Sequence, residues 1–280
     1  MNTLRSVILS AVLFIGVAAF AYPSLLGPTG GANLPTARVA KPGELICAVD
    51  GISNGNSVYE GGSYWTWYGW VTESVSVTTS KTYDYRFLYG MRNNMEIGGT
   101  YNSQNSYTKI NDNGSIYNSK TSLNNWGLNF KQVSSNDFLD FRAGWGVVYQ
   151  NYSSGGNVEQ LYGVLSNAWR TEKGTAYQVS YGLNWTALDN VANFNGSSSQ
   201  TNATRLYIDM EVAFANKINL SGEYQFQGDI DQTALESFVM RYPYSTHWCC
   251  QLGWTNAYRG VLGNKSQTIS LGLAYKNTPW

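Results

Sequence analysis

Charged residues are scarce in this chain, and the two signs balance. Of its 280 residues, 18 are Lys or Arg and 18 are Asp or Glu, so the formal net charge is zero. The charged share of 13% is about half of that in an average soluble protein. A chain without excess positive charge has no electrostatic basis for binding nucleic acid, so we expect no nucleic-acid partner.

Cysteine and histidine are also rare. The cysteines are Cys47, Cys249 and Cys250, an odd set without CxxC spacing, and His247 is the single histidine. The sequence therefore favours neither a disulfide framework nor a metal site. No Gly-rich phosphate-binding loop opens a helix, so we expect no cofactor. A single disulfide from Cys47 to Cys249 or Cys250 stays open, because closure of a barrel would bring the first and last strands together.

Only the N-terminus carries a long apolar run. Arg5 precedes the apolar residues 7–19, and Ala19-Phe20-Ala21 fits a small-x-small cleavage site. This pattern predicts a secretory signal peptide over residues 1–21. The alternative, a transmembrane anchor, is disfavoured because the run is shorter than the roughly 20 residues that a spanning helix needs. A barrel would then be the only way for the rest of the chain to enter a membrane.

Aromatic residues and glycine are abundant. The chain has 21 Tyr, 10 Trp and 29 Gly, a composition that favours strands and turns over helices. No shift in composition divides it. We therefore predict a lead segment over 22–43, periplasmic or within the barrel lumen, and one all-β domain over 44–280.

The stretch "YDYRFLYGMRNNMEIGGTYN", residues 83–102, shows how the strands are patterned. Tyr83, Tyr85, Phe87 and Tyr89 share one face, whereas the other carries charged residues. A soluble sandwich with one solvated face would allow this pattern. So would a membrane barrel with rings toward lipid and charges toward the lumen.

Turn lengths favour the barrel. The predicted strands are 45–51, 83–90, 95–103, 121–133, 138–152, 160–171, 175–188, 204–216, 218–228, 235–243, 246–258 and 267–276. Tight turns alternate with longer loops rich in Asn, Ser and Gly, at 104–120, 153–159, 189–203, 229–234 and 259–266. Short periplasmic and longer extracellular connections are typical of outer-membrane barrels. We predict a single antiparallel transmembrane β-barrel of about 12 strands. Residues 52–82 leave open 14 strands or an extracellular extension of the first two, and a secreted sandwich is the alternative fold.

Two motifs resemble a known family. The stretch "GPTGGANLPTARVAKPGEL", residues 27–45, and the hairpin "YGMRNNMEIGGTYN", residues 89–102, are similar to the opening and the recurring hairpin of YjbH-type outer-membrane proteins associated with exopolysaccharide. The resemblance covers about the first third of the mature chain. It implies an outer-membrane barrel linked to the envelope or to polysaccharide export, and no catalytic residues.

Charged side chains of both signs are expected to face the lumen. The predicted network consists of Asp84, Arg86, Glu96, Lys131, Asp140, Arg142, Asp209, Glu211, Glu223 and Arg241. We interpret these residues as ion pairs across the barrel that fill and rigidify it. A specific solute-binding site and an acid/base pair of carboxylates are the alternatives.

An enzyme is not expected. An outer-membrane lipid hydrolase would need His247 as its base and Ser245 as its nearest serine, and no orienting acid is evident. We therefore predict a passive component of the bacterial outer membrane, either a porin-like small-solute channel or the barrel of a polysaccharide export system. A structural barrel with a closed lumen is the alternative. The expected partners are outer-membrane lipid, the barrel assembly machinery and envelope or polysaccharide-export proteins.

Overall fold

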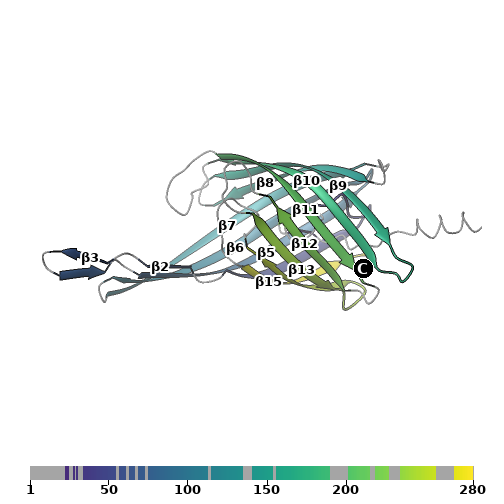
Figure 1. Cartoon of the computed structure of the whole chain (residues 1–280). Coiled ribbons are helices and arrows are strands. Elements are labelled where there is room, and N and C mark those ends of the chain that lie inside the picture. The colour runs from purple at the N-terminus through teal and green to yellow at the C-terminus, as the bar shows by residue number, and fades with distance from the viewer. Residues whose placement is uncertain are drawn as a thin grey trace, which may run out of the picture.

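A computed structural model gives the architecture of most of the chain (Figure 1). It describes residues 23–24, 28, 30, 34–54, 57–60, 63–66, 69–72, 75–112, 115–134, 141–153, 156–189, 201–214, 218–226, 234–256 and 268–279. The predicted signal peptide, residues 1–21, lies outside the described residues. Within those described ranges, no helix is both long enough and apolar enough to cross a membrane.

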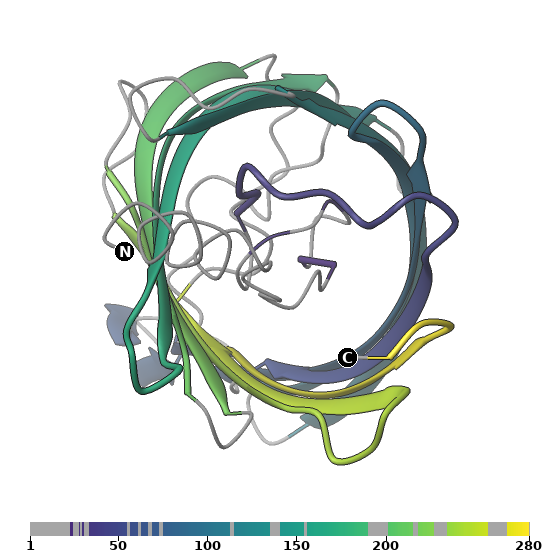
Figure 2. The same ribbon diagram turned by 90° about the vertical axis from the view of Figure 1, so that its right-hand side faces the viewer.

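The described strands form a closed, wholly antiparallel barrel of 12 strands (Figures 1 and 2), as the sequence predicts. In chain order they are β1 (Leu45–Asn54), β5 (Val75–Met91), β6 (Met95–Asp112), β7 (Ser115–Val133), β8 (Arg142–Tyr152), β9 (Asn157–Arg170), β10 (Ala176–Asp189), β11 (Thr201–Ala213), β12 (Asn219–Gln225), β13 (Leu235–Tyr242), β14 (Trp248–Thr255) and β15 (Thr268–Lys276). Consecutive barrel strands pair with one another, and β1 closes the sheet by pairing with both β5 and β15.

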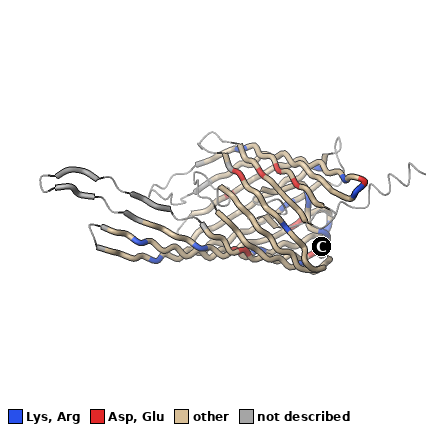
Figure 3. Tube along the Cα trace, turned by 60° about the horizontal axis from the view of Figure 1, so that its bottom comes forward, with Lys and Arg blue, Asp and Glu red and all other residues tan. Residues whose placement is uncertain are grey.

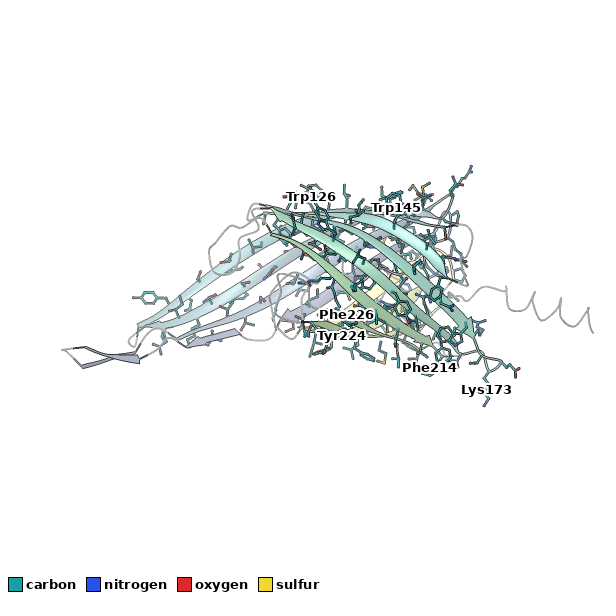
Figure 4. The ribbon with its side chains drawn as sticks, turned by 45° about the horizontal axis from the view of Figure 1, so that its top comes forward. Trp126, Trp145, Lys173, Phe214, Tyr224 and Phe226 are labelled. Atoms are coloured by element: carbon teal, nitrogen blue, oxygen red, sulfur yellow. The ribbon has the colours of Figure 1, made fainter. Side chains whose placement is uncertain are left out.

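Alternate residues on each strand face opposite sides of the wall. On β5, Tyr83 and Phe87 are 48% and 46% exposed, whereas the side chains of Asp84 and Arg86 between them are fully buried. The rings project outward, as do the labelled Trp126 and the other labelled aromatics in Figure 4. Along the barrel strands, charged positions are sparse and of both signs (Figure 3). This polarity suits lipid outside and a polar lumen inside.

Short turns gather at one end of the barrel. Between Met91 and Met95, which pair with each other, Asn93 and Asn94 adopt φ of 61° and 55°. Asparagine tolerates this left-handed conformation better than most residues do. The turn after β9 likewise uses Gly174 at φ 87°. Since short turns are periplasmic in outer-membrane barrels, we refer to this end as the periplasmic end.

The long first connection extends the barrel rather than widening it. β2 (Ser57–Glu60) pairs with the start of β5, and β3 (Ser63–Thr66) pairs only with β4 (Gly69–Thr72) in a separate two-stranded sheet. These elements project beyond the far end of the barrel in Figure 1. The alternative of 14 strands is therefore wrong, and the structure contains an extension at the end of the barrel opposite the short turns.

Several predicted boundaries need correction. The strand predicted to begin at 83 begins at Val75. Residues 104–120, expected to be a loop, continue β6 and β7 nearly to residues 113–114. Their polar side chains carry no alternation because the described ones are not buried on either face, so no apolar face marks the strand. The strand predicted over 138–152 is β8, which is described from Arg142 on, and residues 135–140 lie outside the described residues.

The cysteines do not form the disulfide that was left open. All three are free. Closure does bring β1 beside β15, where Cys47 pairs in register with Tyr275, but Cys249 and Cys250 lie one strand further on, in β14. Cys47 is exposed and Cys249 is buried, so the two thiols also lie on opposite faces of the wall.

Candidate functional site in the barrel lumen

Residues 34–44, hereafter the inner segment, run through the inside of the barrel to its rim, where Lys41, Pro42 and Gly43 are exposed (Figure 2). Main-chain amides of this segment donate to side chains of the wall at three places. Leu34 N donates to Glu223 Oε1 on β12, and Ala40 N to Glu96 Oε2 on β6, both at 2.9 Å. Ala37 N donates to Ser166 Oγ on β9, also at 2.9 Å. The wall therefore supplies acceptors for amides that no strand pairing satisfies.

Side chains add to this attachment. Arg38 forms an ion pair with Glu211 on β11 at 2.8 Å, and the Tyr207 hydroxyl donates to the Pro35 carbonyl oxygen at 2.9 Å. Five buried apolar residues also cluster at the interface, namely Leu34, Ala37, Val133, Val164 and Tyr207. The inner segment is thus held by charge, hydrogen bonds and packing together.

Gly90 allows the closest approach of the inner segment to the wall. Gly43 N donates to Gly90 O at 2.8 Å, and Gly90 N donates to Glu44 O at 2.9 Å. A Cβ at position 90 would collide with the carbonyl oxygen of Lys41. The absence of a side chain here is therefore a requirement of the segment's path, not of the strand.

A charge cluster lies at the seam where β1 meets β5. The Arg86 guanidinium contacts Asp50 and also lies 3.6 Å from Asp84 Oδ2. Asn102 donates to Asp84, and Gln251 donates to Asp50 Oδ1 at 2.8 Å. One Arg86 nitrogen also donates to the main-chain oxygen of Pro23 at 2.7 Å. The cluster thus links strands on both sides of the barrel's closure to the N-terminal chain.

Two further ion pairs stand near the periplasmic end. Lys131 on β7 pairs with Glu96 on the neighbouring β6 at 3.1 Å, and both side chains are fully buried. Lys276 on β15 pairs with Glu44 of the inner segment at 3.2 Å. The first ion pair joins two residues that strand pairing places side by side, and the second joins the wall to the inner segment.

Three carboxylates lie together on β11 and β12. Asp209 and Glu223 are paired in register, and Glu211 is the next inward residue on β11. Asp209 Oδ1 accepts from Ser221 Oγ at 2.8 Å, whereas Glu211 and Glu223 bind the inner segment. Within the described ranges, no group of three His, Cys, Asp or Glu residues is arranged to hold a metal ion.

The remaining predicted charges have different surroundings. Arg241 is buried and donates from Nε to Gln251 Oε1 at 3.2 Å. Arg142, the first residue of β8, is exposed, although it pairs in register with Ser166, which faces the lumen. Asp140 lies outside the described residues. The contacts described above join strands that are adjacent or next but one in the sheet, or they bind the N-terminal chain; none of them joins opposite walls.

Sequence reasoning missed three charged residues of these clusters. Asp50 lies on β1, where "AVDGISN" has too little alternation to assign a face. Arg38 and Glu44 belong to the inner segment, where no predicted strand assigns a face to a side chain. For Arg38, the excess of predicted inward acids over inward bases on β11 and β12 could have pointed to a missing base.

The residues considered for a lipid hydrolase have structural roles. A ring nitrogen of His247 contacts the Lys276 carbonyl oxygen at 2.9 Å. Ser245 Oγ accepts from the main-chain nitrogens of His247 and Trp248, at 3.4 and 3.1 Å. These contacts cap the tight turn before β14.

Comparison with known proteins supports the fold. No protein-family model matches the chain, and the search of curated proteins gives no match. The structure is similar to the COG4313 outer membrane channel from Pseudomonas putida F1, with a TM-score of 0.53 and 11% identity over 86% of this chain and 97% of that one. It also matches the KdgM porin, with a TM-score of 0.45, 11% identity and coverage of 81% and 98%. The NanC porin matches with a TM-score of 0.47, 13% identity and the same coverage. The match to the COG4313 channel thus supports the fold, a closed antiparallel β-barrel like those of outer-membrane proteins.

Proposed function

We propose that the protein is an outer-membrane channel for small solutes whose inner segment narrows the periplasmic half of the lumen. The observation that carries this proposal is the attachment of residues 34–44 to the wall by side chains of β6, β9, β11 and β12. A barrel with 12 strands is wider than the eight-strand type that side chains alone fill. An internal segment can therefore set the width of the path.

The attachment suits a constriction better than a structural filler. Much of it consists of polar contacts to charged groups, which exchange with water more readily than a packed apolar core does. A lumen that served only for rigidity would gain more from well-packed hydrophobic residues than from buried ion pairs. The mixed charges of the wall also suit solutes that carry no strong net charge.

Conductance in a planar lipid bilayer tests this function. We expect the wild-type protein to give steady single-channel steps. In the variant Arg38→Met/Glu211→Met one anchor is removed as a whole pair, so that no unpaired charge stays buried. Its conductance should exceed that of the wild type because the inner segment is held less firmly.

The matched control is Glu236→Met, which removes an exposed carboxylate on β13. This change should leave conductance as in the wild type. If both the correctly folded wild type and the correctly folded double variant give no conductance steps, the lumen is sealed. The barrel then has the structural role instead.

A second candidate is the barrel of a polysaccharide export system. It is favoured by the similarity of residues 27–45 to the opening of YjbH-type proteins, because Pro35 and Ala37 of that motif are the residues bound by Tyr207 and Ser166. A strain lacking the gene should then lose surface polysaccharide, and the wild-type gene should restore it. Unchanged surface polysaccharide in that strain would exclude the export role.

A further inference from the structure

Five buried polar side chains on the lumenal wall hold side-chain atoms that have no hydrogen-bond partner in the described structure. These atoms are Thr100 Oγ1, Asn125 Oδ1, Asn129 Oδ1 and Nδ2, Gln150 Nε2 and Tyr162 Oη. Each of the five residues is at most 7% exposed. Buried polar groups normally have partners, so a concentration of unpaired ones requires an explanation. We refer to these five residues as the amide patch.

The amide patch is continuous across β6, β7, β8 and β9. In register, Thr100 lies beside Gly127 and Gly127 beside Gln150. Asn125 and Asn129 are the inward residues on either side of Gly127 on the same strand. Strand pairing therefore gathers four of the five side chains around Gly127.

Glycines let these side chains lie along the wall. A Cβ at Gly98 would lie 2.9 Å from Asn129 Nδ2, and one at Gly127 would lie 2.8 Å from Thr100 Oγ1. A Cβ at Gly146 would collide with the Tyr162 hydroxyl. These three polar ends thus lie over glycines of adjacent strands, which keeps them close to the wall.

The chemistry of the patch is uncharged and mixed. The Asn129 amide offers a donor and an acceptor, Asn125 offers an acceptor, Gln150 a donor, and the two hydroxyls can do both. The charged residues nearest along these strands, Glu96 and Lys131, are paired with each other at 3.1 Å. An ion would find no opposite charge here. A sugar hydroxyl, which both donates and accepts, matches such a mixture.

We propose that the amide patch is a binding site for an uncharged, polyhydroxylated solute of the saccharide class. This assignment rests on the proposed channel function only in that solutes reach the lumen. The assignment specifies the chemical class of solute that the proposed channel would carry. The amides replace the solute's water shell with fixed hydrogen bonds, so that it is drawn into the barrel without any net charge in the wall.

Calorimetric titration of maltotriose into the full chain in detergent tests the assignment. We expect saturable binding by the wild type and binding weaker by about tenfold or more in Asn129→Leu/Gln150→Leu, which removes several of the mixed donors and acceptors. An acidic trisaccharide of similar size should bind the wild type more weakly than maltotriose, because no positive charge in the patch offsets its desolvation.

The matched control is Asn184→Leu on β10. Asn184 is also a buried asparagine, but its Oδ1 accepts from Thr186 Oγ1 at 3.5 Å and it lies outside the patch. Its affinity for maltotriose should equal that of the wild type. Heat-modifiable gel migration confirms that each variant is folded.

The outcomes separate this inference from the channel function. Absence of maltotriose binding, or equal affinity in the patch and control variants, would overturn the inference and assign the patch to hydration alone, even if the channel conducts. Binding that depends on the patch in a barrel without conductance would support the inference and overturn the channel. Titration in detergent needs no ion flow, so the two measurements are independent.

Discussion

Two buried tyrosines on the lumenal wall pack in the same way, but their hydroxyl groups have different surroundings. Tyr207 on β11 lies over Gly182 of β10, and Tyr162 on β9 lies over Gly146 of β8. Both rings are buried, at 1% and 3% exposure. The Tyr207 hydroxyl donates to Pro35 of the inner segment, whereas the Tyr162 hydroxyl has no partner in the described structure.

The difference extends to the two regions around these rings. Around Tyr207, carboxylates accept hydrogen bonds from the inner segment, so the wall stabilises a part of its own chain. Around Tyr162, uncharged groups are buried without partners, at a cost of about 1–3 kcal/mol for each such group. One wall design thus serves attachment in one region and is held ready for another molecule in the other. Four predictions test this contrast.

The largest effect is expected at the charge cluster of the seam. Arg86→Leu leaves Asp50 and Asp84 buried without their guanidinium, so the free energy of unfolding should fall by about 3–5 kcal/mol. Urea unfolding in lipid vesicles measures this loss. The control is Phe87→Leu, because Phe87 follows Arg86 in the chain but faces outward. This substitution should lower the free energy of unfolding much less. Equal losses would mean that the buried charges do not stabilise the seam.

The next effect concerns the path of the inner segment. Gly90→Val places a side chain where Lys41 O lies, so the hydrogen bonds of Gly43 and Glu44 should break at a cost of about 2–3 kcal/mol. Channel conductance should rise with the displaced segment. At Gly163 a Cβ meets no atom within 4 Å, so Gly163→Val is the control and should change neither quantity. If the two variants had the same stability and the same conductance, the inner segment would not pass over Gly90.

A gain of stability is expected within the amide patch. Asn129→Leu replaces a buried amide that has no partner with an apolar side chain of similar size. The free energy of unfolding should therefore rise by about 1–2 kcal/mol. The midpoint temperature of heat-modifiable gel migration follows this change. A loss of stability would show that the amide is already satisfied and would contradict the contrast between the two regions.

The smallest effect compares the two tyrosines directly. Tyr207→Phe loses one hydrogen bond to the inner segment and should destabilise the barrel by about 1 kcal/mol. Tyr162→Phe loses an unpaired hydroxyl and should be neutral or slightly stabilising. The same urea unfolding assay measures both. If the two substitutions cost the same, the hydroxyls have equivalent surroundings.

Much of the barrel follows from the sequence because its signal is local. The alternation of Tyr83, Asp84 and Phe87 predicts a strand with one apolar face. The pair Asn93 and Asn94 predicts the turn that follows. That pattern ends in residues 104–120 of β6 and β7, where neither face is buried, so the sequence predicts a loop there.

The site depends on contacts that sequence patterns do not encode. The inward direction of Glu96 and Glu223 could be read from alternation, but not that each accepts an amide of residues 34–44. The amide patch was missed because uncharged inward residues are common in any lumen. Only strand register shows that Asn125, Asn129 and Gln150 surround one glycine.

The inner segment also has a consequence for the order of folding. It precedes β1 in the chain, yet Leu34 finds its partner Glu223 189 residues later. Contacts of such long range form late, because the entropy of closing the loop must be overcome first. The segment joins β1 at Leu45, at the periplasmic end, so it can enter the lumen through that end as the wall closes. A barrel that closes without the segment in place would leave Glu96, Glu211 and Glu223 without the bonds that the segment gives them.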